Sequence, residues 1–132
     1  MPADTISRTP RRIGPALRTF HPQILLARGI DHNLVIDGKA GELRPAAELI
    51  DPASGRRLLV STTQPAVQVY TANNFNGSQT AGDGLLLRQA DGIAFETQHY
   101  PDSPNQPSFP STLLRPGEVF TSTTVYAFGV VK

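Results

Sequence analysis

Short apolar runs, each closed by Gly, Pro, Asn or Asp, are the feature that most restricts how this chain can fold. The 132 residues include 12 prolines and 11 glycines, and helical periodicity is hard to find between them. Apolar runs with such boundaries are typical of β-strands. The pattern therefore predicts an all-β protein.

The expected strands follow from these runs. They cover residues 23–28, 33–37, 45–50, 57–62, 67–72, 85–88, 92–98 and 122–131. The segment DPASGR at 51–56 is expected to form a tight hairpin turn, because Asp can bond its own backbone and Gly accepts a positive φ. The polar segment 73–84 is expected to be a loop. Many short strands at near-regular spacing predict an antiparallel sandwich or barrel.

The length and the distribution of residues indicate one domain at most. A chain of this size can bury about two thirds of the surface of its unfolded state. We expect residues 1–12 to be a poorly ordered leader. Residues 13–132 then make up the folded part.

Composition and charge exclude several classes of function. The formal net charge of +1 gives no electrostatic basis for binding nucleic acid or an anionic membrane surface. The absence of cysteine excludes disulfides, cysteine metal ligands and a cysteine nucleophile, and it fits a cytoplasmic protein. The N-terminus lacks the apolar region of a secretory signal, and no run approaches the length of a membrane span.

Metal and nucleophile sites find little support in the sequence. None of the three histidines has a partner at the spacing of a zinc site. The trio Glu96, His99 and Asp102 would share a face only on a helix, and Pro101 and Pro104 argue against a helix there. The chain also lacks the Gly-x-Ser-x-Gly elbow of a serine nucleophile. We therefore expect no metal ion.

Two carboxylates stand in unusual places. Asp31 directly precedes an expected strand, and Glu96 lies inside a strand between two apolar neighbours, ahead of four prolines spaced three apart. From the residues alone, Glu96 is either a solvent-facing strand residue or a general base. Pairing, burial or hydrogen bonding would be needed for the second role.

Four longer phrases resemble successive motifs of one enzyme family. They are GIDHNLVID at 29–37, STTQPAVQVYTANN at 61–74, GIAFETQHYPDSPNQPSFP at 92–110 and LLRPGEVFTSTTVYAF at 113–128. Their order and spacing resemble the aldose 1-epimerase (galactose mutarotase) family, from about Pro10 to the C-terminus. The resemblance implies the C-terminal portion of that family's antiparallel β-sandwich, a galactose mutarotase-like supersandwich.

The resemblance also implies an activity and two site residues. Glu96 corresponds to the family's general base, and Asp31 to a carboxylate that accepts hydrogen bonds from sugar hydroxyls. The segment after Glu96 would form a rigid wall beside the sugar. The implied enzyme is an isomerase that interconverts the α and β anomers of an aldohexose by acid and base catalysis. Such a reaction requires no metal and no cofactor.

The chain departs from the family pattern in several places. The family's acid histidines and a sugar-binding arginine belong to motifs that precede the matched region, and His21, His32 and His99 resemble none of them. Ala66 and Ala72 stand where the family usually has glycine. A sandwich without its other strands would expose sheet edges and an apolar face. We therefore expect self-association, a complementing N-terminal chain, or marginal stability of the chain alone.

Other functions are compatible with the same residues. A non-catalytic carbohydrate-binding module would use Asp31 and Glu96 only as hydrogen-bond acceptors. A structural remnant would have no affinity for sugar, and Glu96 would then be a surface residue. A glycosidase built on the two carboxylates is a further alternative, against which the motifs favour the epimerase.

Overall fold

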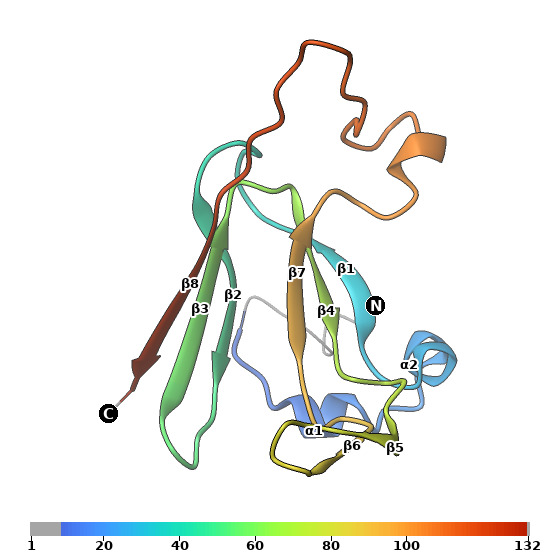
Figure 1. The fold of residues 1–132 in the computed structure, drawn as a ribbon, viewed down its shortest axis with the longest axis vertical. Coiled ribbons are helices and arrows are strands. Elements are labelled where there is room, and N and C mark those ends of the chain that lie inside the picture. Colours follow the sequence, from blue (N-terminus) through green and yellow to red (C-terminus); the bar gives the residue numbers. More distant parts are fainter. Residues whose placement is uncertain (1–8, 132) are drawn as a thin grey trace. The chain divides into compact units, whose positions relative to one another are not determined.

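The structure is a computed structural model, and it describes residues 9–131 (Figure 1). Strands dominate, as predicted for an all-β fold. The elements in chain order are α1 (Ile13–Ala16), α2 (Pro22–Ala27), β1 (Asp31–Val35), β2 (Arg44–Ile50), β3 (Arg56–Thr62), β4 (Ala66–Tyr70), β5 (Asn76–Thr80), β6 (Leu86–Arg88), β7 (Ala94–Gln98), the 3-10 helix η1 (Ser103–Asn105) and β8 (Thr124–Val130). The expectation for residues 1–12 falls mostly on 1–8, which lie outside the described residues.

The chain divides into two compact units. The first contains the residues up to His32 together with Val69–Ala94, and the second contains Asn33–Gln68 together with the residues from Phe95 onward. The first unit holds α1, α2 and the β5-β6 pair. The second holds a three-stranded sheet in the order β2-β3-β8, and a further sheet has the order β1-β4-β7. No helix within residues 9–131 has both the length and the apolar character needed to cross a membrane.

The predicted strand at 23–28 is wrong, because this segment forms α2. Pro22 occupies the first turn, and the His21 ring caps the helix by accepting a hydrogen bond from the backbone N–H of Gln23 at 3.3 Å. Such a start favours a helix. The helix buries Ile24 and ends at Arg28, which is left-handed with φ 56°. A short apolar run does not by itself distinguish a strand from a buried helix segment.

The predicted loop at 73–84 is also wrong in part. Residues Asn76–Thr80 form β5, which pairs antiparallel with β6 through Asn76 opposite Arg88 and Thr80 opposite Leu86. Residues 76–80 show no apolar alternation that would have indicated this strand. Backbone pairing stabilises it instead, and polar side chains are compatible with such pairing when they face solvent.

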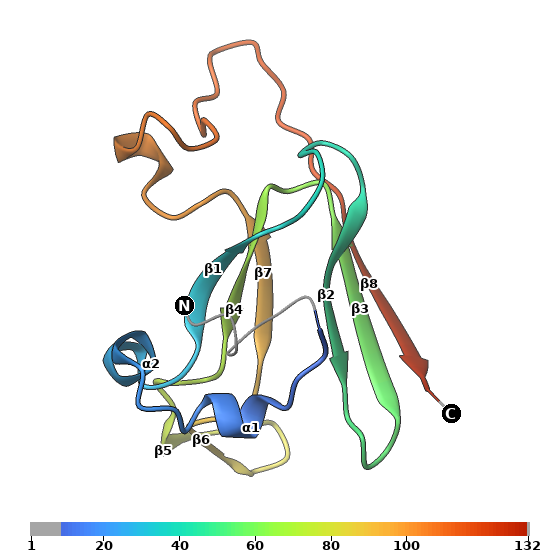
Figure 2. The same cartoon turned by 180° about the vertical axis from the view of Figure 1, so that it is seen from behind.

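The three strands of the β2-β3-β8 sheet lie where strands were predicted, at 45–50, 57–62 and 122–131. Both pairs are antiparallel, with Leu49 and Phe128 opposite Leu58 from either side. The turn at 51–56 is confirmed, because the Asp51 carboxylate accepts from the backbone N–H of Ala53 at 3.1 Å and Gly55 has φ 72°. Figures 1 and 2 show the three strands side by side, with β3 in the middle.

Cross-strand pairs define two faces of the β2-β3-β8 sheet. One face, which we call the inner face, carries four directly opposed pairs. They are Arg56 with Val130, Leu58 with Phe128, Val60 with Tyr126, and Thr62 with Thr124. Val60 and Thr62 are fully buried. The opposite face carries the ion pair of Arg57 with Glu48, and it is the solvated face expected of an antiparallel sheet.

Ala66 and Ala72, the two positions at which the resemblance led us to expect glycine, differ in their backbone conformation. Ala66 lies in β4 and is fully buried. Ala72 follows β4 and has φ 55°, a left-handed conformation that costs a non-glycine residue about 1–2 kcal/mol. Position 72 therefore has a physical reason to be glycine, whereas the backbone at 66 gives none.

We expect Ala72→Gly to stabilise the protein by about 1 kcal/mol, because glycine adopts positive φ without the Cβ clash. Urea unfolding followed by circular dichroism measures the change. Ala66→Gly is the matched control, and it should destabilise by about 0.5–1 kcal/mol or more because glycine weakens a strand interior. Equal changes in the free energy of unfolding for the two substitutions would contradict the inference that the left-handed backbone strains Ala72.

Candidate active site

Asp31 begins β1, and the residue before it is clamped by two buried side chains. The Thr71 hydroxyl accepts from the Ile30 N–H at 3.0 Å, and the Asn73 amide donates to the Ile30 carbonyl at 2.9 Å. The Thr71 N–H also donates to that carbonyl at 3.0 Å. Ile30 is 1% exposed. Because both backbone groups of Ile30 are fixed, the backbone that carries the exposed Asp31 starts from a defined position.

Gly29 makes this clamp sterically feasible. A Cβ at position 29 would lie 2.2 Å from the Asn73 side-chain oxygen and 2.9 Å from the Thr71 hydroxyl, and the φ of Gly29 is +149°. Neither the space nor the backbone conformation suits another residue. The Arg-Gly-Ile sequence before Asp31 thus contains a glycine that the clamp requires.

His32 contributes a second contact to Asp31. Its Nδ1 accepts a hydrogen bond from the Asp31 N–H at 3.0 Å, which requires that nitrogen to be unprotonated. Burial lowers the pKa of His32, while the Asp31 carboxylate acts in the opposite direction. The neutral ring therefore suits its role as an acceptor beside Asp31.

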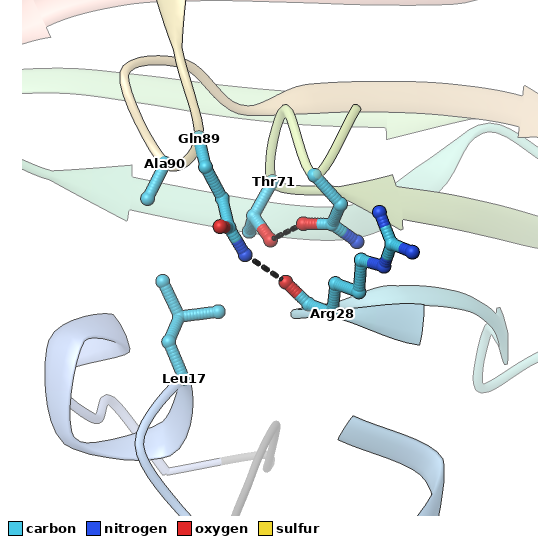
Figure 3. Close-up of a pocket in the computed structure, with 6 residues that line it drawn as sticks. Leu17, Arg28, Thr71, Gln89 and Ala90 are labelled. Carbon is cyan, nitrogen blue, oxygen red and sulfur yellow. Dashed lines mark hydrogen bonds between the residues drawn. The ribbon is translucent and has the colours of Figure 1, made fainter. Parts of the chain in front are cut away.

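A small cavity lies in the same unit, next to the clamp. Its volume is about 140 Å³, and it is lined by Leu17, Arg28, Thr71, Asn73, Gln89 and Ala90. Gln89 donates a hydrogen bond to the Arg28 carbonyl (Figure 3). The Thr71 hydroxyl donates to the Asn73 side-chain oxygen at 2.7 Å. Neither predicted site residue lines the cavity.

Glu96 lies in the middle of β7, in the second unit, and its side chain is exposed. No residue within 9–131 forms a hydrogen bond or ion pair with its carboxylate. Its two neighbours are anchored to β8. The Phe95 carbonyl accepts from the Tyr126 hydroxyl at 3.0 Å, and the Thr97 and Thr124 hydroxyls are 2.6 Å apart.

These anchors determine the direction of the Glu96 side chain. Successive side chains of a strand point to opposite faces. Thr97 contacts Thr124 on the inner face of the β2-β3-β8 sheet, so Glu96 points to the other side of β7. The Thr124 hydroxyl also lies 3.0 Å from that of the buried Thr62. A fixed strand therefore presents a carboxylate that is accessible to a ligand.

The proline-rich segment after β7 is held by its own hydrogen bonds. Asp102 is left-handed with φ 66° and caps η1. Its carboxylate accepts from the Asn105 amide at 2.6 Å and from the Gln106 amide at 2.9 Å. The buried Ser103 donates its hydroxyl to the Tyr100 carbonyl at 2.7 Å. Together with the prolines, these bonds restrict the backbone near the end of β7.

Hydrogen bonds from Asn105 and then Gln106 hold the pKa of the Asp102 carboxyl below its usual value. A carboxyl with a lowered folded pKa stabilises the fold above its unfolded pKa, about 3.9, and the contribution is lost as pH falls through the folded pKa. We expect Asn105→Ala to raise the titration midpoint of Asp102 toward its usual value, as followed by carboxyl-carbon NMR. An unchanged midpoint would exclude Asn105 as the main cause.

The trio considered for a metal ion does not come together as a ligand set. Glu96 is on β7, His99 follows the strand, and Asp102 bonds Asn105 and Gln106. His99 instead packs near Phe120, with ring centroids 6.3 Å apart. No group of three potential ligands of this kind is found among residues 9–131.

Comparison with known proteins identifies the family. The aldose 1-epimerase family profile matches residues 2–127. The chain is 42% identical to human galactose mutarotase over 123 residues, which cover 93% of this chain and 34% of that protein. It is 36% identical to the aldose 1-epimerase of Escherichia coli over 76% of this chain and 30% of that protein. The chain belongs to the aldose 1-epimerase family.

A solved structure supports the family fold. The GalM/aldose epimerase homologue from C. elegans superposes with a TM-score of 0.65 at 26% identity, over 78% of this chain and 30% of that chain. The chain thus spans about a third of the length of the relatives that it matches. The predicted all-β sandwich of the aldose 1-epimerase type is confirmed as the fold class.

The motifs indicated Asp31 and Glu96 as site residues. They did not indicate the residues that fix the backbone next to these two carboxylates. Thr71 and Asn73 lie in a phrase that resembled the family, yet nothing in the sequence paired them with Ile30. Thr97 directly follows Glu96, and its partner Thr124 is 27 residues away. Local sequence carries no signal for such distant hydroxyl contacts, although polar residues at strand ends are a weak indication.

Asn33, two residues after Asp31, has a buried polar group that the sequence did not predict. Its side-chain oxygen is buried, and no donor within residues 9–131 reaches it. A buried acceptor without a donor costs about 1–3 kcal/mol. Asn33 therefore carries an unsatisfied acceptor in the segment Asp31-His32-Asn33.

Proposed function

We propose that this chain supplies the general base and a sugar-binding carboxylate of an aldose 1-epimerase. Glu96 is the proposed base, and Asp31 is the proposed acceptor for sugar hydroxyls. The observation that carries the proposal is the accessible Glu96 carboxylate on a strand anchored on both sides, at Phe95 and Thr97. A cytoplasmic location and an aldohexose substrate belong to the same proposal.

In the proposed reaction, the Glu96 carboxylate takes the proton of the anomeric hydroxyl. A general acid protonates the ring oxygen while the bond between C1 and that oxygen breaks. The open aldehyde rotates about the C1–C2 bond, and the reverse transfers close the ring as the other anomer. Precise placement of the base is important, because proton transfer requires hydrogen-bond distance to the hydroxyl.

The general acid is proposed to come from the part of the epimerase domain outside the matched segment. The chain spans about a third of the human galactose mutarotase length. None of His21, His32 and His99 was matched to a family acid, and His32 uses its Nδ1 to accept from Asp31. Full turnover would thus require the remaining two thirds of the domain.

The second candidate is a non-catalytic sugar-binding module. The exposure of Asp31 and Glu96 favours it, since hydroxyl recognition requires only accessible acceptors. The two candidates differ in turnover. A module would bind both anomers, and their interconversion would proceed at the uncatalysed rate measured in buffer.

Galactose titration and anomer exchange, both followed by NMR, test the proposal together. We expect galactose to shift the amide signals around Asp31 and Glu96. To test turnover, we would build a chimera in which this chain replaces the matching segment of human galactose mutarotase, and we expect it to accelerate α/β exchange. Binding without exchange in the chimera would favour the module, and absence of both would overturn the proposal.

A further inference from the structure

The position of the Glu96 carboxylate depends on the strand that carries it, because within the described part of the chain no other group bonds this carboxylate. β7 is an end strand in the sheet order β1-β4-β7, so β4 pairs with one of its edges. Two side chains of β8 tie it down on either side of Glu96. Tyr126 donates to the Phe95 carbonyl, and Thr124 contacts Thr97. A general base must be placed to within hydrogen-bond distance of its proton, so both contacts are candidates for positioning it.

The two contacts differ in what lies behind them. Tyr126 is 47% exposed, and its contact is with a single backbone carbonyl. The Thr124 hydroxyl, which lies 2.6 Å from that of Thr97, is also 3.0 Å from the hydroxyl of Thr62. Thr62 lies directly opposite Thr124 on β3 and is fully buried. A chain of three hydroxyls therefore connects β7 through β8 to the core.

The buried end of this hydroxyl chain determines which group donates at each contact. The Thr62 hydroxyl is 3.1 Å from the Thr123 carbonyl, which can only accept, so this contact requires the single Thr62 proton. The contact between Thr62 and Thr124 then requires the Thr124 proton. The contact between Thr124 and Thr97 requires the Thr97 proton in the same way. No other assignment gives all three contacts a proton, and the N–H of Gln64 donates to the remaining acceptor position of Thr62 at 3.1 Å.

This arrangement makes the hydroxyl chain rigid. The Thr62 hydroxyl uses its one donor and both of its acceptor positions, and β-branched side chains have restricted χ1 rotation. The Thr123 carbonyl at the end of the chain also accepts from the Thr63 N–H at 3.0 Å. Loss of the Thr124 hydroxyl would remove an acceptor from Thr97 and a donor from Thr62 together. The strand that carries Glu96 would then lose its connection to the core.

We propose that Thr124 is a positioning residue for Glu96, acting through the hydroxyl chain that runs from Thr97 to the buried Thr62. The inference rests on the proposed role of Glu96 as the general base and adds a residue that acts on it from a distance. Thr124 lies on the inner face of its sheet, whereas Glu96 points to the other side of β7. The hydroxyl chain fixes the strand, and the strand fixes the distance from the carboxylate to the anomeric hydroxyl.

Rates of α/β exchange by the chimera, normalised to folded protein, test the proposal. We expect Thr124→Val to lower kcat for galactose about 10- to 100-fold, with KM changed less than about threefold, because a small misplacement of a catalytic group affects the chemical step. Thr124→Ser keeps the hydroxyl and should restore kcat to within about threefold. Thr123→Val is the matched control, since Thr123 is exposed and its hydroxyl forms no hydrogen bond among the described residues.

A double variant separates positioning from a general loss of structure. In the Glu96→Gln background, Thr124→Val should lower the remaining rate less than about twofold, because two residues that act through one group are not additive. A merely structural role would lower the rate by the same factor in both backgrounds. Amide hydrogen exchange in the chain alone gives a readout without sugar. We expect exchange at 95–98 to be about tenfold faster in Thr124→Val than in Thr123→Val.

Several results would overturn the positioning role and leave Glu96 as the base. They are an unchanged kcat of Thr124→Val, an equal loss in Thr123→Val, equal factors in the two backgrounds, or equal exchange of the 95–98 amides. Full activity of Glu96→Gln would instead overturn the proposed function, and the inference with it. If Thr124→Val does not fold, Thr97→Val takes its place with the same expectations, because it removes only the outermost hydroxyl.

Discussion

Replacing Glu96 with glutamine is expected to lower catalysed α/β exchange of galactose by about 10²- to 10⁴-fold, the usual contribution of a general base. Glutamine keeps the size and the hydrogen-bonding oxygen but cannot take the proton of the anomeric hydroxyl. Galactose affinity should change little, because the glutamine side chain can still contact sugar. The measurement is NMR exchange spectroscopy on the chimera and its variant.

Glu42→Gln provides the control for this experiment. Glu42 is an exposed glutamate of the second unit, and its carboxylate forms a surface ion pair with Lys39 at 3.8 Å. Pairs of this kind contribute little to stability, so exchange should be unaffected. If Glu96→Gln retained full exchange, Glu96 would not be the base, and its position on β7 would have only a structural meaning.

Replacing Gly29 with alanine is expected to destabilise the fold by about 3 kcal/mol or more. The new methyl group would lie 2.2 Å from the Asn73 side-chain oxygen, in a backbone conformation of φ +149°. Overpacking and backbone strain each cost about 1–3 kcal/mol. Asn73 would have to move and release the Ile30 carbonyl, so the start of β1 at Asp31 would also loosen.

Urea unfolding measures the free energy, and NMR shifts of residues 30–32 report the local change. Gly82→Ala is the matched control, because a Cβ at position 82 meets nothing within 4 Å. That substitution should change the free energy of unfolding by less than about 1 kcal/mol. A similar loss in both variants would show that the clamp on Ile30 contributes no specific stability.

Both predictions depend on contacts between residues that are distant in sequence. Ile30 and Asn73 are 43 positions apart, and Glu96 is held through the partners of its neighbours on β8. The sequence supplied the identity of the two carboxylates through motif resemblance. It did not supply the groups that orient them, because hydroxyl and amide contacts leave no periodic signal in the chain.

The fold could be predicted from the sequence where the pattern of apolar side chains matches the strands that the structure contains. The apolar runs and the turn at Asp51–Gly55 predicted the strands β2, β3 and β8 and the β2-β3 hairpin correctly, but they did not indicate that β8 pairs with β3. The apolar run at 23–28 was misassigned. Its conformation depends on a histidine cap and a proline in the first turn, which outweigh the apolar composition. β5 was missed because backbone pairing alone stabilises it.

The sequence by itself therefore determined the all-β class and the family, since these depend on residue types and their order along the chain, and it indicated Asp31 and Glu96 as the proposed site residues. Only the tertiary structure decided that Ala72 is left-handed, that Gly29 faces Asn73, and that Phe128 is uncovered. These properties arise from which distant segments share space. Steric exclusion and burial act on those neighbours, and a linear pattern does not specify them.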